Sequence, residues 1–166
     1  MSQTLNALHR RAFLLTGAAL GLMIAHPALA GDGAFANAPQ RKTSDEDWKR
    51  TLSPDSYAVL RQEATERPYT SPLLNEHRAG VFACIACGLP LFKSDWKFDS
   101  HPGWPSFFDA IKANLGTKRD FKIIEERTEY HCARCLGHQG HVFDDGPKPT
   151  GLRYCNNGVA LKFIPA

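Results

Sequence analysis

The sequence predicts a mainly β domain that begins with short helices. The chain has 13 glycines and 11 prolines among 166 residues, and this share of turn-forming residues favours short strands over a helical bundle. After Tyr69, short apolar runs lie between Gly, Pro and Asp residues, a pattern typical of strands joined by turns. At 43% hydrophobic residues, the chain is long enough for one domain with a core and short of the usual size for two.

The first thirty residues have the pattern of an export signal. Arg10 and Arg11 precede an apolar run, and Ala28-Leu29-Ala30 supplies the small residues that a signal peptidase requires. The run is shorter than the roughly 20 residues that cross a bilayer, and the paired arginines resemble a twin-arginine signal. We expect a periplasmic protein without a membrane anchor, cleaved after Ala30, or after Ala36 as a second candidate. A buried N-terminal helix is the alternative.

The charge balance gives no reason to expect a polyanionic partner. The chain has 20 basic and 17 acidic residues, and two of the basic ones, Arg10 and Arg11, lie in the expected signal. The remaining surface is therefore close to neutral, which disfavours nucleic-acid binding driven by phosphate neutralisation. Nothing indicates an obligate protein partner, so we expect a monomer.

Two short helices are expected before the strands begin. Ser44 is followed by three acidic residues, a helix start with a hydroxyl cap. Ser53 and Pro54 repeat the signal with proline at the first helical position, and this second helix should end before Pro68. The preceding Gly-, Ala-, Asn- and Pro-rich stretch has no apolar period and predicts a flexible linker. The chain thus divides into a signal over 1–30, a linker over 31–43 and one domain over 44–166.

Five apolar runs between turns predict strands. They are Val81–Ala83, Pro90–Phe92, Phe121–Ile124, His141–Phe143 and Ala160–Ile164.

Two Cys-X-X-Cys turns predict a metal site. Cys84 and Cys87 form the first turn, Cys132 and Cys135 form the second, and 44 residues separate the two pairs. A glycine soon after each pair should supply the positive φ that such a turn needs. Four thiolates complete a tetrahedral zinc site with no open position, so this metal should hold segments together rather than react. Disulfides are the alternative in an exported protein, although zinc loaded in the cytoplasm before export would avoid them.

The fifth cysteine is the candidate nucleophile. If its segment is a strand, period-two alternation places Arg153, Cys155 and Asn157 on one face. A neighbouring guanidinium favours the thiolate, which is the reactive form. A buried, inert cysteine is the alternative.

Two further clusters carry side chains suited to chemistry. His138 and His141 lie three residues apart, and either could exchange protons, bind metal or be a satisfied structural group. Trp104 lies in a Gly- and Pro-rich aromatic loop, where it could form a binding wall or a core corner.

Several long motifs resemble the methionine-R-sulfoxide reductases of the B type. In chain order they are Cys84-X-X-Cys87-Gly88, Lys97–Ser100, Gly103–Phe107, Gly137–Pro147 and Thr150–Asn157. The resemblance runs from about Asp45 to Phe163. It implies a fold of two antiparallel β-sheets (β-tent, Mss4-like) with short N-terminal helices and one structural Zn²⁺ on the four cysteines.

The resemblance also implies roles for individual residues. The matched positions are Cys155, His138, His141, Arg153 and Asn157 for catalysis, and Trp104 and Phe143 for substrate binding. It implies attack of Cys155 on the sulfur of R-methionine sulfoxide in peptides, release of methionine, and a sulfenic acid on that cysteine.

The sequence departs from the family at one position. Many members have a second cysteine just before the Gly-Trp of the aromatic loop, where this chain has Pro102. With four cysteines assigned to zinc, an external thiol or a thioredoxin-like protein should reduce Cys155 directly. The alternatives from other functional classes are a zinc-ribbon binding module and a thiol peroxidase.

Overall fold

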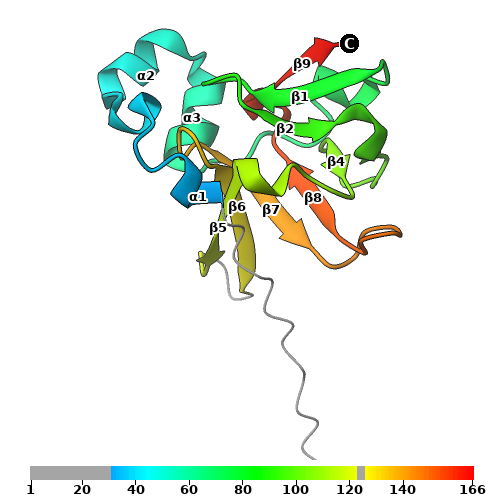
Figure 1. Ribbon diagram of the computed structural model, residues 1–166. Coiled ribbons are helices and arrows are strands. Elements are labelled where there is room, and N and C mark those ends of the chain that lie inside the picture. The colour runs from blue at the N-terminus through cyan, green and yellow to red at the C-terminus, as the bar shows by residue number, and fades with distance from the viewer. Residues whose placement is uncertain (1–30, 123–125) are drawn as a thin grey trace, which may run out of the picture.

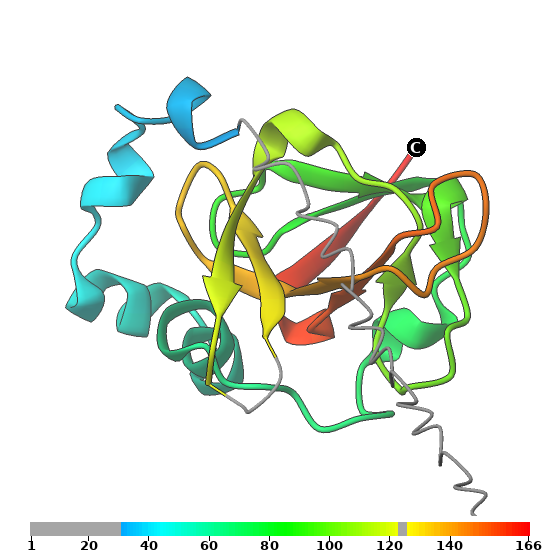
Figure 2. The ribbon, with the colours of Figure 1, turned by 90° about the horizontal axis from the view of Figure 1, so that it is seen from below.

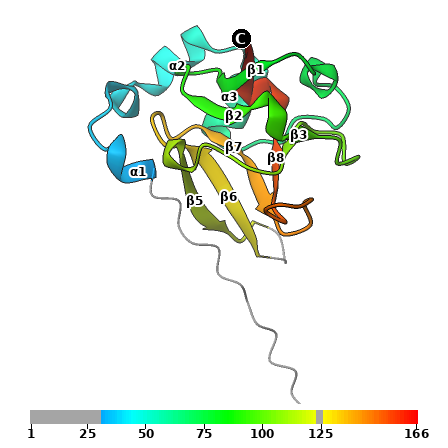
Figure 3. The same cartoon turned by 45° about the vertical axis from the view of Figure 1, so that its right-hand side comes forward.

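Two antiparallel sheets make up most of the structure, a computed structural model that describes residues 31–122 and 126–166. One sheet has three strands in the order β2-β1-β9, and the other has six in the order β3-β4-β8-β7-β6-β5. Figure 1 shows the smaller sheet above the larger one, and the turned view in Figure 3 gives the same arrangement. The strands are β1 (Gly80–Cys84), β2 (Pro90–Lys93), β3 (Lys97–Phe98), β4 (Ser106–Phe107), β5 (Leu115–Asp120), β6 (Arg127–Cys132), β7 (His138–Phe143), β8 (Arg153–Asn156) and β9 (Leu161–Pro165). The mainly β prediction is confirmed.

Both expected helices form where their caps predict. Helix α2 (Asp45–Thr51) has Ser44 as its N-cap, and helix α3 (Pro54–Gln62) has Ser53, whose side chain accepts from the Ser56 amide. The second helix ends at Gln62, and Glu63 caps it in a left-handed backbone conformation. These helices lie along one side of the two sheets, as the view from below shows (Figure 2).

The stretch expected to be a flexible linker is bound to the domain instead. Residues 31–43 contain helix α1 (Gly31–Ala34) and a 3-10 turn. Arg41 donates to the carbonyl of Ala133, within the second cysteine turn, and to the backbone and side chain of Asp32. The several hydrogen bonds made by this guanidinium hold the segment in place, although its composition is typical of a flexible linker. The expected signal over 1–30 lies outside the described residues, and no helix among the described ones is long and apolar enough to span a bilayer.

One expected strand is misplaced. The run Phe121–Ile124 was predicted from its apolar residues, but β5 ends at Asp120, and residues 123–125 lie outside the described part. The carboxylate of Asp120 accepts from the amide of Lys122, a local hydrogen bond that competes with sheet pairing. Phe121 is 64% exposed, so its apolar side chain marks no core position. The polar sequences of β5 and β6 gave no apolar alternation from which to predict them.

Aromatic side chains join the two sheets. Phe107 of β4 is fully buried and stacks on Phe92 of β2, with ring centroids 4.1 Å apart. Its edge meets Phe82 of β1 at 5.0 Å, and Tyr130 and Tyr154 pack around Phe92 from the larger sheet. The core therefore lies between the inner faces of the sheets, and α3 adds Val59 and Leu60 to it.

Replacing Phe107 with alanine should destabilise the fold by about 3–5 kcal/mol, because it removes a buried ring that contacts both sheets. Urea unfolding followed by tryptophan fluorescence measures the change in the free energy of unfolding. Phe121→Ala, at an exposed ring, is the matched control and should change stability by less than about 0.5 kcal/mol. Equal losses in the two variants would contradict this description of the core.

Candidate metal centre and active site

The four paired cysteines meet where the two sheets approach each other. Cys84 ends β1 and Cys87 lies in the turn to β2, while Cys132 ends β6 and Cys135 lies in the turn to β7. All four sulfur atoms lie within 4.8 Å of one another. The Sγ atoms of Cys84 and Cys135 are 3.6 Å apart, and those of Cys87 and Cys132 are 3.5 Å apart. Each close pair therefore joins one sheet to the other.

These distances fit a metal cage and do not fit disulfides. A disulfide holds its sulfurs about 2.05 Å apart, whereas four thiolates around zinc, each at about 2.3 Å, are about 3.8 Å from one another. The side-chain amide of Gln139 donates to the sulfur of Cys84 at 3.6 Å, as an outer hydrogen bond to a metal-bound thiolate would. The four residues could hold one zinc ion, which would stabilise the junction of the sheets and leave no open position for substrate.

The two cysteine turns use different residues for the left-handed conformation. In the first turn Gly88 has φ 73°, as predicted. In the second turn the residue with positive φ is Leu136, at 60°, and not Gly137. A Cβ on Gly137 would come within 2.8 Å of a methyl group of Leu60, so this glycine is needed for close packing against α3 rather than for its backbone angle.

Cys155 lies in a row of side chains that crosses the larger sheet. In β8 it is directly opposite Ser106 of β4 and His141 of β7, and His141 is opposite Glu129 of β6. Residues opposite each other in neighbouring strands share one face of a sheet. Arg153, two residues before Cys155, lies on this face too, whereas Tyr154 between them points into the core. The strand and the placement of Arg153 are as predicted from alternation.

A bulge brings His138 to the same face as His141. Tyr130 pairs with Gly140, but the next residue of β6, His131, pairs with His138, so Gln139 is an extra residue in β7. Without it, residues three apart would lie on opposite faces, because side chains alternate along a strand. The two imidazole rings are 5.5 Å apart. The sequence singled out both histidines, but nothing in it predicted the bulge.

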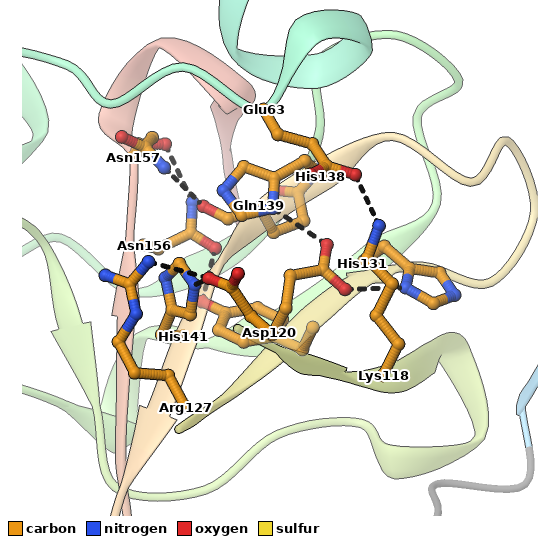
Figure 4. Close-up of polar contacts among 12 residues, drawn as sticks. Glu63, Lys118, Asp120, Arg127, His131, His138, Gln139, His141, Asn156 and Asn157 are labelled. Atoms are coloured by element: carbon orange, nitrogen blue, oxygen red, sulfur yellow. Dashed lines mark hydrogen bonds and ion pairs between the residues drawn. The ribbon is translucent and has the colours of Figure 1, made fainter. Parts of the chain in front are cut away.

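Two carboxylates that sequence reasoning missed hold these histidines. Nδ1 of His138 is 2.7 Å from Glu129. Nε2 of His141 is 2.7 Å from Asp120, and these two side chains point toward each other in Figure 4. Although burial raises the pKa of Asp120, hydrogen bonds from the Lys122 amide, His141 and Arg127 lower it well below its usual range. Burial also raises the pKa of Glu129, but hydrogen bonds from His131 and His138 outweigh this effect and lower the pKa. Both carboxylates are therefore ionised at neutral pH. Burial in turn lowers the pKa of His141, against the influence of Asp120.

The surroundings of Cys155 act on its thiol in opposite directions. Burial raises the pKa of Cys155, whereas the charge of Arg153 and a hydrogen bond from Ser106 lower it, and the net change is upward. Arg153 is fixed by two hydrogen bonds of 2.8 Å to the carboxylate of Asp145, and its guanidinium lies 4.3 Å from the ring centre of Phe143. The cation and the aromatic ring thus form one side of the cysteine's environment.

Trp104 and Asn157 are connected through Glu66. The indole N–H of Trp104 donates to the carbonyl of Glu66, and the amide N–H of Glu66 donates to the side chain of Asn157. Asn157 lies just after β8, and its amide donates to the carbonyl of Gln139 at the bulge. Asn157 therefore links the tryptophan loop to the histidine strand. Glu66 is a third residue that sequence reasoning missed, since it links Trp104 and Asn157 through its backbone.

A cavity lies against the tryptophan loop. It has a volume of about 390 Å³, and Trp104, Tyr69 and Phe98 are among its lining residues. Cys155 and the two histidines do not line it. The fold therefore brings the cysteine, the histidines and Arg153 together on one face of the sheet. Hydrogen bonds through Glu66 and Asn157 link Trp104 to the strand that carries the histidines.

A thiol outside the four-cysteine cluster, on the same face as imidazoles that hydrogen-bond to carboxylates, is an arrangement suited to an enzyme that uses thiol chemistry. The SelR domain model matches residues 52–165. Peptide methionine sulfoxide reductases MsrB of Bradyrhizobium diazoefficiens and Agrobacterium fabrum are 54% and 50% identical over 74% and 76% of this chain, and over 88% and 95% of their own lengths. The MsrB of Leifsonia xyli is 49% identical over 82% of this chain and 96% of its own.

The chain belongs to the MsrB family of peptide methionine sulfoxide reductases. It is therefore an enzyme that reduces methionine sulfoxide, and neither the zinc-ribbon binding module nor the thiol peroxidase describes it. Likeness to the solved Mis18 "Yippee-like" domain is weak, with a TM-score of 0.41 and 20% identity over 54% of this chain and 98% of that one.

Loss of one cysteine from the cluster should release the metal. We expect the purified protein to hold about one zinc per chain and Cys87→Ser to hold much less and to melt at a lower temperature, because a closed site depends on all four ligands. Atomic emission and thermal unfolding measure the two quantities. Cys155→Ser, outside the cluster, is the control and should keep its zinc. Full zinc occupancy in Cys87→Ser would contradict the assignment.

Proposed function

We propose that this enzyme reduces the R epimer of peptide-bound methionine sulfoxide through a sulfenic acid on Cys155. The observation that supports this most is that Cys155 is the one cysteine of the five outside the metal cluster and lies opposite His141. A thiolate at this position is placed beside groups that donate protons, as reduction of a sulfoxide requires.

The reaction begins when the Cys155 thiol gives up its proton to an imidazole on the same face and the resulting thiolate attacks the sulfoxide sulfur. The sulfoxide oxygen takes up one proton as the S–O bond breaks, and His138 and His141 are the candidates to supply it. The oxygen is transferred to Cys155, so methionine leaves reduced and the cysteine becomes a sulfenic acid. Zinc, when bound to the four cysteines, supplies structural stability only.

The aromatic side chains give a basis for choosing one epimer. Trp104 is fixed by its hydrogen bond to Glu66, so its ring offers a rigid apolar surface for the S-methyl group. Phe143, beneath the Arg153 guanidinium, bounds the other side of the cysteine. With the methyl group and the peptide chain positioned, only one epimer presents its oxygen to the histidines.

Regeneration must come from outside the chain. Since the position before Gly103 is Pro102, the sulfenic acid has no cysteine partner outside the four of the cluster. A first external thiol condenses with the sulfenic acid and releases water, leaving a mixed disulfide on Cys155. A second thiol then attacks this disulfide and restores the free cysteine. A small thiol or a thioredoxin-like dithiol supplies both equivalents.

An epimer-resolved assay tests this function. With dithiothreitol as reductant, the enzyme should consume the R epimer of a methionine sulfoxide peptide and leave the S epimer, and Cys155→Ser should lose about a thousandfold or more in rate because the nucleophile is gone. Zinc content and circular dichroism of the variant control for its folding. Activity on the S epimer, or an active Cys155→Ser, would sink the proposal.

The same assay without reductant tests the intermediate. One methionine per enzyme should form, and mass spectrometry should find a single added oxygen on Cys155 that a dione reagent traps. A disulfide from Cys155 to another cysteine of the chain would contradict both the external regeneration and the zinc assignment.

We further propose export to the periplasm by the twin-arginine route, with cleavage after Ala30. The support is the sequence of residues 1–30. Export of an already folded chain suits a metal site that must form before its thiols meet an oxidising compartment.

Replacing Arg10 and Arg11 with lysines should leave the protein in the cytoplasm, whereas Arg50→Lys should not change its location. Cell fractionation with immunodetection measures this. Unchanged periplasmic accumulation of the Arg10 and Arg11 variant would exclude the twin-arginine route.

A further inference from the structure

One buried carboxylate has no part in the chemistry described so far. Glu129 is 2% exposed, yet its pKa lies below the usual range, so it is held ionised inside the protein. A buried charge is costly unless it is fully paired. Its two oxygens each meet one imidazole: Oε1 lies 2.7 Å from Nδ1 of His138, and Oε2 lies 3.1 Å from Nδ1 of His131.

The sheet register places this carboxylate between the two rings. Glu129 is opposite His141, and the bulge at Gln139 makes His131 and His138 the next opposed pair on the same face. An ionised carboxylate only accepts hydrogen bonds, so His138 must carry a proton on Nδ1. Among the described residues, Nε2 of His138 has no hydrogen-bond partner, which leaves it as the ring nitrogen available to a substrate.

The far side of the carboxylate is fixed as well. Nε2 of His131 lies 3.2 Å from a carboxylate oxygen of Asp32, and Arg41 donates to the same carboxylate. With His131 anchored, Glu129 has one orientation in which both its oxygens are satisfied. The plane of the His138 ring follows from that orientation.

We propose that Glu129 is a positioning residue for sulfoxide reduction: it fixes the tautomer and ring plane of His138 so that Nε2 is presented to the substrate oxygen. The proposal rests on the function proposed above. Asp120 contacts the other type of ring nitrogen, Nε2, in His141. The two histidines therefore have different ring nitrogens left for the substrate, and Glu129 positions only His138.

Glu129→Gln changes the hydrogen bonding of this side chain while keeping its shape. A glutamine side chain has nearly the same volume, but it accepts through one atom and donates through the other, so it cannot receive protons from both histidines. We expect kcat to fall about 10- to 100-fold, part of the 10²–10⁴ that positioned proton transfer contributes, while KM changes less than about threefold. Glu129→Asp keeps the charge and should recover part of the lost rate.

Imidazole nitrogen NMR of the substrate-free enzyme is the decisive readout. In the wild type, His138 in its neutral form should carry its proton on Nδ1, and in Glu129→Gln this preference should be lost. Glu63→Gln is the matched control: Glu63 pairs with Lys118 and Lys122 rather than with a histidine, so tautomer and kcat should stay as in the wild type.

A wild-type His138 protonated on Nε2 would overturn the proposal without any variant. So would wild-type kcat in Glu129→Gln, or a reduced kcat with the tautomer unchanged. If Glu129→Gln does not fold, Glu129→Asp is compared with the wild type by the same two measurements. If the wild-type enzyme does not reduce methionine sulfoxide, the proposed function is wrong. The NMR measurement then still tests, independently of activity, whether Glu129 sets the tautomer of His138.

Discussion

The junction at the four cysteines is the constraint on which the site depends. Each close sulfur pair joins the turn after β1 to the turn after β6, so the cluster ties the small sheet to the large one. Strand β7 leaves the second cysteine turn directly and carries the bulge in its first residues. Gln139, the bulged residue, donates to Cys84. The metal site and the histidine placement are thus two parts of one structural unit.

The alternation of side chains lets one sheet serve both as a wall of the core and as the floor of the site. In β8, Tyr154 packs among the aromatic rings between the sheets, while Cys155 and Arg153 face the other way. Core packing therefore fixes the backbone on which the reactive thiol is carried. A short strand such as β4 gains its stability from Phe107 and places Ser106 beside the cysteine. Side chains held by a packed strand are more precise than side chains held by loops.

Polar groups buried around the histidines are stabilised by one another. Glu129 and Asp120 would be costly charges alone, but each accepts from an imidazole, and Asp120 accepts from Arg127 as well. Asn157 bonds the Gln139 carbonyl and the Glu66 amide, so the loop bearing Trp104 is held to the same unit. A network of this kind specifies one arrangement, since any rearrangement leaves a buried group unpaired.

The sequence by itself determined the fold class, both helix starts, the four-cysteine cluster and the family, because caps, turns and ligand pairs are local patterns. It also placed Arg153 and Cys155 on one face, since alternation needs only the strand. Only the tertiary structure decided what requires a partner strand. The bulge that turns His138 towards His141 exists in the pairing of β6 with β7, and the roles of Glu129, Asp120 and Glu66 arise from neighbours distant in the chain. The segment 31–43 illustrates the same limit. Its composition predicts a flexible linker, but the hydrogen bonds from Arg41 to Ala133 and Asp32, which the sequence does not indicate, hold it against the domain.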